Sequence, residues 1–290
     1  MLTPLPQRCD VATVRRVATV VVCLGLTLGA PSCARFVRHD RPYVPFATSP
    51  SSTWHGYARH DFVIRGRGCT VVTPQQIAEG VPWVWRASFF DQRPEVEVAL
   101  LEAGFHVVYV DVLDLCGSPD AVAQWDAVYD LLTQGHGFSA RPALTAISRG
   151  GLIAYNWATA HPDRVACIFA DIPVCDFKSW PGGYGRGPGD AGEWRRCLRA
   201  YGLDEASALR FGGNPVDGLA PLAAAGVPLL HAHARADPLV PFDENTGILA
   251  ERYRALGGDT TVLEKPGAGH APGVDPPEQV IEFLRRCGAG

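Results

Sequence analysis

The stretch at residues 144–152 places a serine where it could act as a nucleophile. An apolar run leads into Ser148, and two glycines and a helical segment follow. A serine on a sharp strand-to-helix turn presents its hydroxyl at the carboxyl edge of a sheet. The turn would also aim the amide of Arg149 at a developing oxyanion. The pattern indicates a nucleophilic serine for acyl transfer. The usual nucleophile motif has a glycine two residues before the serine, where this chain has Ala146, so a tight strand-to-helix turn without activity is the alternative.

Two further side chains complete the set that acyl transfer requires. Asp237 and His270 each follow an apolar, strand-like run, and His270 lies in a glycine-rich loop. An imidazole can take the serine proton, and a carboxylate holds that imidazole in the useful tautomer. The chain order Ser, Asp, His is a known order for such triads. Asp171 is a second candidate for the acid, and chain order alone does not choose between the two carboxylates.

An alternation of strands and helices would bring these residues together. Strand, helix, strand in regular succession predicts a mostly parallel sheet with helices on both faces. Each triad candidate lies just past the carboxyl end of a predicted strand, where parallel sheets carry their sites. We expect an opening hairpin at 61–64 and 69–72, strands at 82–85, 105–110, 142–147, 165–170, 227–232 and 260–264, and helices at 95–103, 121–132, 151–160, 245–256 and 277–286.

The chain from about residue 59 to 286 resembles the α/β-hydrolase superfamily, in particular secreted bacterial hydrolases near its prolyl-oligopeptidase and acetyl-esterase branches. The matching stretches are AISRGG at 146–151, ADPLVP at 236–241 and GAGH at 267–270. The resemblance implies an eight-stranded sheet and a triad of Ser148, Asp237 and His270. It also implies an oxyanion donor after the third strand, for which we expect the amide of Ala87, with Ser88 next.

Residues 173–226 interrupt the alternation with a segment dense in glycine and proline. A loop of that length inside a domain is usually functional or disordered, and its aromatic residues favour a lid over a pocket. We expect Trp180 to contact substrate and Arg86 to grip a substrate carboxylate or sulfate. Trp83 and Trp85 could line a pocket near Ser148, with plain core packing as the alternative. His106, His231 and His233 are expected to be hydrogen-bonded structural histidines.

The N-terminus has the layout of a secretory signal peptide at residues 1–34. Three arginines precede an uncharged run at 17–30, and small residues surround Cys33, which could carry a lipid anchor. Residues 35–57 read as a linker or arm, and 58–290 as the hydrolase domain. The net charge is −4, without a block of like charges, which argues against a nucleic-acid or membrane partner. Export would permit disulfides, and Cys175–Cys197 is the expected pair.

These observations predict an exported serine hydrolase that cleaves a carboxylic ester, for example an acyl group on a glycan, through an acyl-enzyme. A serine peptidase of the same fold is the alternative, although the sequence before residue 58 is too short for a propeller-sized domain. A non-catalytic binding protein of this fold is a further alternative, because fold alone does not establish function. No cysteine or histidine cluster has metal-ligand spacing, so no cofactor is expected.

Overall fold

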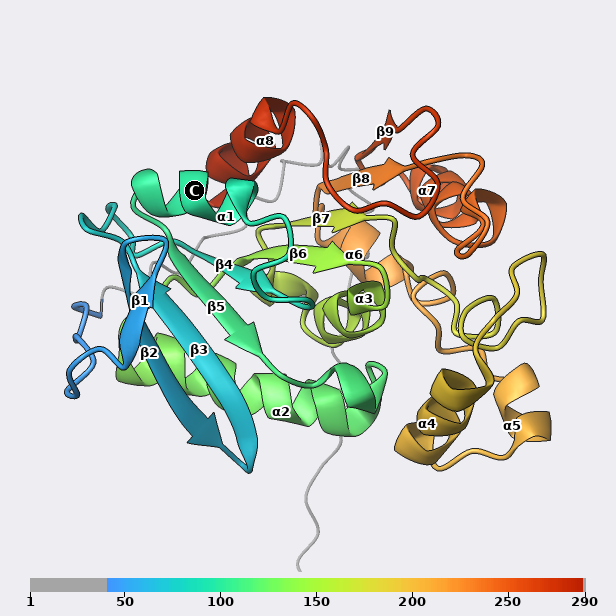
Figure 1. Cartoon of the computed structure of the whole chain (residues 1–290), viewed down its shortest axis with the longest axis horizontal. Coiled ribbons are helices and arrows are strands. Elements are labelled where there is room, and N and C mark those ends of the chain that lie inside the picture. The colour runs from blue at the N-terminus through green and yellow to red at the C-terminus, as the bar shows by residue number, and fades with distance from the viewer. Residues whose placement is uncertain (1–40, 289–290) are drawn as a thin grey trace, which may run out of the picture. The chain divides into compact units, whose positions relative to one another are not determined.

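The computed structural model of the protein describes residues 41–288, so the predicted signal peptide and Cys33 lie outside the described residues. Strands and helices alternate as the sequence predicts, around one continuous sheet (Figure 1). The strands are β1 (Ser52–Trp54), β2 (Tyr57–Ile64), β3 (Arg67–Thr73), β4 (Trp83–Arg86), β5 (His106–Val110), β6 (Ala143–Ile147), β7 (Cys167–Asp171), β8 (Leu229–His233) and β9 (Thr260–Glu264). The helices are α1 (Glu95–Glu102), α2 (Pro119–Asp130), α3 (Gly150–Ala160), α4 (Ala191–Tyr201), α5 (Glu205–Leu209), α6 (Ala220–Ala224), α7 (Thr246–Ala255) and α8 (Glu278–Gly288), with 3-10 turns η1 (Leu113–Leu115), η3 (Pro162–Arg164) and η4 (Phe242–Glu244) and a π-helical turn η2 (Leu131–Gly135).

The sheet formed by residues 41–288 has nine strands, in the order β1-β2-β3-β5-β4-β6-β7-β8-β9. The first four in this order pair antiparallel, and the pairs from β5–β4 to β8–β9 are parallel. The sequence predicts eight strands; the ninth is β1, which lies in the expected linker and pairs Ser52 with Arg59. A three-residue edge strand is held by main-chain hydrogen bonds, so it leaves little side-chain pattern in the sequence.

The hydrophobic core lies on both faces of the sheet and follows the two-residue period of the strands. In β4, Trp83 and Trp85 pack on one face with Trp125 of α2, whereas Val84 packs on the other with Leu284 of α8. The rings of Trp85 and Trp125 stack at a centroid distance of 4.0 Å. Both tryptophans of β4 are therefore core residues and line no pocket. Helices α1 and α8 cover one face, and α2 and α3 the other (Figure 1).

The predicted insertion between β7 and β8 contains α4, α5 and α6, so it is an ordered part of the fold. In Figure 1, α4 and α5 lie beyond the ends toward which the parallel strands point. A small core of its own holds the insertion together, with Phe177 and Trp194 packed against Leu152 of α3 and Val240. Because Leu152 follows the nucleophile turn and Val240 follows Asp237, this core joins the insertion to the catalytic edge of the sheet.

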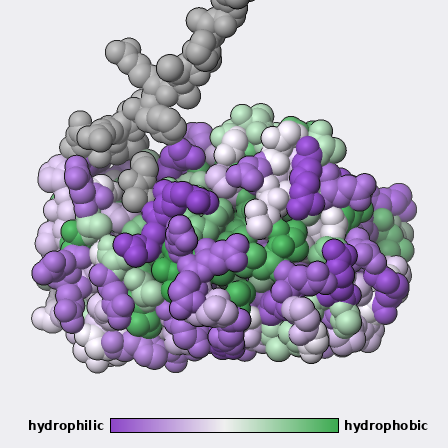
Figure 2. All heavy atoms as spheres, turned by 90° about the horizontal axis from the view of Figure 1, so that it is seen from above, coloured by the Kyte–Doolittle hydropathy of each residue, from purple (hydrophilic) through white to green (hydrophobic). Residues whose placement is uncertain are grey.

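The surface of the described chain is mostly polar. The face shown in Figure 2 is largely hydrophilic, with smaller hydrophobic groups between the polar residues. No helix within residues 41–288 combines the length and the hydrophobicity needed to cross a membrane. The exposed large hydrophobic side chains lie on different elements: Val44, Val63, Ile77, Tyr184, Leu209 and Leu256.

Candidate active site

Ser148 occupies the sharp turn between β6 and α3 that the sequence predicts. Its φ angle is +49°, in the left-handed region that costs a non-glycine residue free energy. The turn is held from both sides, because the Ser148 amide donates to the Asp171 carbonyl at 3.0 Å and its carbonyl accepts from the Val174 amide at 2.8 Å. A Cβ at Gly150 would collide with the Ser88 side chain. Alanine is tolerated at 146 because it pairs with another small residue, Ala170 of β7.

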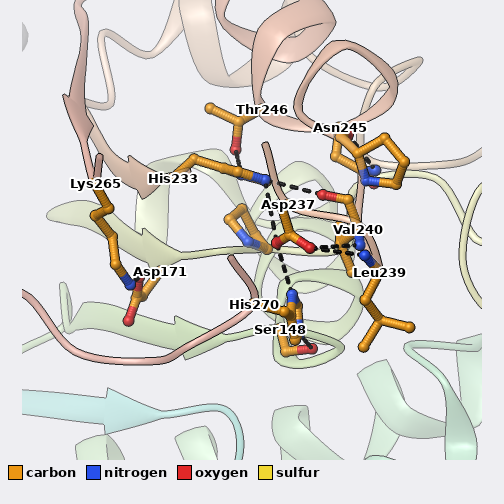
Figure 3. Close-up of polar contacts among 12 residues, drawn as sticks. Ser148, Asp171, His233, Asp237, Leu239, Val240, Asn245, Thr246, Lys265 and His270 are labelled. Atoms are coloured by element: carbon orange, nitrogen blue, oxygen red, sulfur yellow. Dashed lines mark hydrogen bonds and ion pairs between the residues drawn. The ribbon is translucent and has the colours of Figure 1, made fainter. Parts of the chain in front are cut away.

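The three predicted triad residues form one hydrogen-bonded chain (Figure 3). Ser148 Oγ lies 2.9 Å from His270 Nε2, and His270 Nδ1 lies 2.7 Å from Asp237 Oδ2. With the Nδ1 proton donated to the carboxylate, Nε2 is free to accept the serine proton. The structure therefore brings a hydroxyl, an imidazole and a carboxylate into the arrangement of an activated nucleophile.

The carboxylate of Asp237 is buried and held in its charged form. Its second oxygen, Oδ1, accepts hydrogen bonds from the amides of Leu239 and Val240, both at 2.9 Å. Burial acts to raise the pKa of Asp237, but the hydrogen bonds from His270 and from these amides outweigh it and leave the pKa below its ordinary value. Asp237 is thus an anion that orients His270 and stabilises the imidazolium form.

A chain of buried neutral side chains supports the Asp237 loop from the core. His233 Nε2 lies 3.0 Å from the Val240 carbonyl, which can only accept, so this nitrogen carries the proton. Thr246 then donates to His233 Nδ1 at 2.8 Å and accepts from His231 Nδ1 at 3.0 Å. His231 Nε2 accepts from the Tyr155 hydroxyl. Burial lowers the pKa of both histidines, to about 3 for His231, which keeps them neutral.

The expectation for the buried histidines holds for His231 and His233 and is wrong for His106. Neither ring nitrogen of His106 has a hydrogen-bond partner among the described residues. Its ring instead packs against Phe138 at a centroid distance of 4.3 Å. Burial lowers its pKa to about 3, so it is a neutral core residue.

Asp171, the second candidate for the acid, has a different partner. Lys265 Nζ lies 2.7 Å from Asp171 Oδ1, and the amide of Gly273 donates to the other carboxylate oxygen. Lys265 also donates to the Ala271 carbonyl at 2.6 Å. Asp171 therefore anchors both ends of the loop that carries His270. Of the two candidate carboxylates, Asp237 is the one that the structure places against His270.

One of the two predicted oxyanion donors is wrong. The amide of Ala87 donates to the Thr145 carbonyl at 2.8 Å, continuing the ladder between β4 and β6 one residue past the end of β4, so it is not available to substrate. No hydrogen bond between described residues engages the amides of Arg149, Ser88 or Phe89. The amide of Arg149 thus stays the expected first donor, and the amides of Ser88 and Phe89 are the candidates for the second.

Arg86 shapes that turn and cannot bind substrate as predicted. Its side chain is 95% buried and forms an ion pair with Glu97 at 2.6 Å. Its Nε donates to the Ser88 carbonyl, and its Nη2 donates to the carbonyls of Phe89 and Gln92. A planar guanidinium can bind several carbonyl oxygens at once, and here it binds groups of the protein itself. The sequence shows the arginine but not its inward direction, which depends on Glu97 being placed by α1.

The insertion reaches the nucleophile turn through Arg149. The guanidinium of Arg149 lies 2.9 Å from Glu193 of α4 and stacks over the ring of Phe89. Trp180 is half-buried against the core of the insertion, and its contact with substrate remains a prediction. Lys178 donates to the Phe211 carbonyl at 2.9 Å and is part of the same scaffold.

The sequence matches no family model and no curated protein, whereas solved structures share its fold. Acylaminoacyl peptidase of Pyrococcus horikoshii is 16% identical with a TM-score of 0.62, over 80% of this chain and 42% of that one. A puromycin-hydrolyzing peptidase of Mycobacterium tuberculosis is 17% identical with a TM-score of 0.61, over 79% and 38%. A putative dipeptidyl aminopeptidase IV of Bacteroides ovatus is 11% identical with a TM-score of 0.59, over 80% and 35%. The chain thus spans about two fifths of these structures. With the sheet order described above, these likenesses identify the fold as the α/β-hydrolase fold.

Proposed function

We propose that the protein is a serine hydrolase that cleaves amide bonds in small peptide-like or aminoacyl substrates. The observation that carries this proposal is the hydrogen-bonded chain from Ser148 through His270 to Asp237. His270 would take the Ser148 proton as the oxygen attacks a carbonyl, and would return it to the leaving group. The Arg149 amide, with one from Ser88 or Phe89, would stabilise the oxyanion. Water would then release the acyl group from Ser148.

The choice of an amide substrate rests on the structural neighbours. All three structures described above are named as peptidases. Their names favour the serine peptidase, which the sequence analysis gives as its alternative, over the ester hydrolase that it predicts first. The same triad would also cleave a carboxylic ester, for example an acyl group on a glycan, because an alcohol is a better leaving group than an amine. Ester hydrolysis is therefore the second candidate, and activity on an activated ester alone does not identify the physiological bond.

A matched pair of tests separates these possibilities. A fluorophosphonate probe is expected to label the wild-type protein and not Ser148→Ala, since the probe reacts with an activated serine. Substrates with one common aminoacyl group, as p-nitroanilide and as p-nitrophenyl ester, then compare the two leaving groups. Turnover of N-blocked or free aminoacyl anilides supports the peptidase proposal. Ester cleavage together with no amide cleavage over the panel would overturn it in favour of an esterase, and unlabelled wild-type protein would indicate a binding protein.

We also propose that the protein is exported, on the layout of residues 1–34. Expression in a bacterial host followed by mass determination of the mature chain tests this proposal. Loss of about the first 34 residues supports cleavage after Ala34, and a diacylglyceryl group on Cys33 supports a lipid anchor. A cell-associated, unprocessed chain starting at Met1 would contradict both forms of the proposal.

A further inference from the structure

Four of the six cysteines within residues 41–288 lie in two close pairs. All six are free thiols in the structure. Cys116 and Cys197 lie together in the small core of the insertion, and Cys287 packs against the core cluster that contains Cys167. Within each pair, the neighbouring thiol shifts the pKa of Cys197 or Cys287. Cys69, Cys116 and Cys175 each donate to a main-chain carbonyl two residues away in sequence, at 3.7, 3.9 and 3.8 Å. Cys69 and Cys175 belong to a different core cluster from the members of the two pairs. The packing therefore brings Cys197 together with Cys116, whereas the sequence-based prediction pairs it with Cys175.

The first pair joins the insertion to the body of the domain. Cys116 ends η1 in a left-handed conformation at φ +50°, and Cys197 lies in α4, which packs against η1. Both residues belong to the small core of the insertion and are almost fully buried, at 6% and 3% exposure. The contact brings together residues that are far apart in sequence, so it is a product of tertiary packing.

The second pair joins the C-terminal helix to the centre of the sheet. Cys167 is the first residue of β7 and is fully buried, and Cys287 lies near the end of α8. Helix α8 packs along β7, and Cys287 packs against the core cluster that contains Cys167. A covalent bond here would close the sequence from β7 to the C-terminal helix into one loop.

We propose that Cys116–Cys197 and Cys167–Cys287 are two disulfide-forming sites, each oxidised by exchange with a carrier disulfide such as oxidised glutathione. One cysteine thiolate of the pair attacks the carrier, forms a mixed disulfide and releases one carrier thiol. The second cysteine displaces the remaining carrier thiol. The pair loses two electrons and two protons, and the carrier gains both and leaves as two thiols.

The two sites differ in how readily they react. The neighbouring Cys167 thiol, with help from Arg286, lowers the pKa of Cys287 to about 7, so much of it is thiolate near neutral pH. Cys197 is the opposite case, because the neighbouring Cys116 thiol and its burial raise its pKa. The pair at Cys167 is therefore expected to oxidise in the folded protein, and the pair at Cys116 while the insertion is still loosely packed.

The first disulfide would fix a helix next to the nucleophile. Glu193 and Cys197 are four residues apart in α4 and thus lie on the same side of the helix. Glu193 binds the guanidinium of Arg149, the residue after Ser148, and Cys197 would hold the same side of α4 to η1. The bond would keep α4 in its position over the nucleophile turn.

Peptide mapping of the full chain tests the proposal. Reduced protein is equilibrated with oxidised and reduced glutathione through an unfolding and refolding step, blocked with iodoacetamide in denaturant and digested without reductant. We expect peptides cross-linked through 116–197 and 167–287, with Cys69 and Cys175 alkylated. Cys175→Ser should leave both links intact, whereas Cys197→Ser should free only Cys116. Alkylation of both members of a pair overturns the assignment of that pair, as would a link from Cys175 to Cys197.

Discussion

Lys265 and Asp171 form a buried ion pair that ties the end of β9 to the end of β7, with Nζ 2.7 Å from Oδ1 and side-chain exposures of 9% and 2%. The pair stands beside the triad, as Figure 3 shows, and holds the loop that carries His270. A buried pair of this kind contributes little net stability compared with an apolar pair, but removal of one partner leaves an uncompensated charge. We therefore expect the pair to position the loop of His270.

Lys265→Met is expected to lower the free energy of unfolding by about 3–5 kcal/mol, the usual cost of breaking a buried pair. It should also lower kcat, because the loop around His270 loses its attachment to β7. Urea unfolding and steady-state kinetics measure the two effects. Arg235→Met is the matched control, since its ion pair with Glu264 is exposed and should contribute less than about 1 kcal/mol. Equal effects of the two variants would show that the buried pair does not position the loop.

Asp237→Asn is expected to reduce kcat by about 10⁴-fold while the protein remains folded, as in comparable triads where the amide selects the wrong tautomer of the histidine. Asp171→Asn serves as the comparison, because it keeps the contact of Asp237 with His270. It should lose stability and a smaller part of the activity. Similar losses of kcat in the two variants would return Asp171 to consideration as the acid.

Arg86→Lys is expected to lower kcat with little change in KM. A lysine keeps a positive charge beside Glu97 but cannot bind the carbonyls of Ser88, Phe89 and Gln92 together. The turn that supplies the second oxyanion donor would then lose its shape, with a loss of up to the roughly 10²–10³-fold that one such donor is worth. The exposed ion pair of Arg67 with Asp114 provides the control, Arg67→Lys, which should leave kcat unchanged. An unaltered kcat in Arg86→Lys would rule out this role for Arg86.

The stability of the protein should decrease as the pH falls below 6.5, partly because of His231. Its folded-state pKa of about 3 lies below the ordinary value of 6.5, so between these values the unfolded chain binds one more proton than the folded one. Such a difference changes the free energy of unfolding by about 1.4 kcal/mol per pH unit. Urea unfolding at pH values from 6 to 4.5 should therefore give a smaller slope for His231→Asn. The exposed His55 provides the control variant His55→Asn, and an equal slope in wild type and His231→Asn would refute the argument.

The triad could be predicted from the sequence because each member follows a strand in a regular alternation. Parallel strands bring their carboxyl ends to one edge, so strand-end residues far apart in sequence must meet there. The same alternation predicted a mostly parallel sheet covered by helices on both faces, whereas the α/β-hydrolase fold was implied by the resemblance of the stretches at 146–151, 236–241 and 267–270. The edge strand β1 could not be predicted, because its three residues are held by main-chain hydrogen bonds, and the Pro- and Ser-rich composition of its surroundings favours a linker.

The errors concern groups whose partners depend on register or packing. The amide of Ala87 is engaged because the ladder with Thr145 continues past β4, and one residue of register decides whether an amide faces the sheet or the substrate. Arg86 points inward because α1 places Glu97 beneath it. The cysteine pairing likewise depends on how α4 packs on η1, and the spacing of cysteines along the chain does not contain that information.

The left-handed backbone of Ser148 has a consequence for how this protein can change. Glycine would adopt the same φ of +49° at little steric cost, so the turn itself would be more relaxed with a residue that has no hydroxyl. The strands and helices around Ser148 hold its backbone in this strained conformation, as they do at other sites where backbone strain serves function. A Ser148→Gly change would thus remove the hydroxyl and relax the turn at the same time, so at this position the requirement for a hydroxyl and the requirement for an unstrained backbone oppose each other.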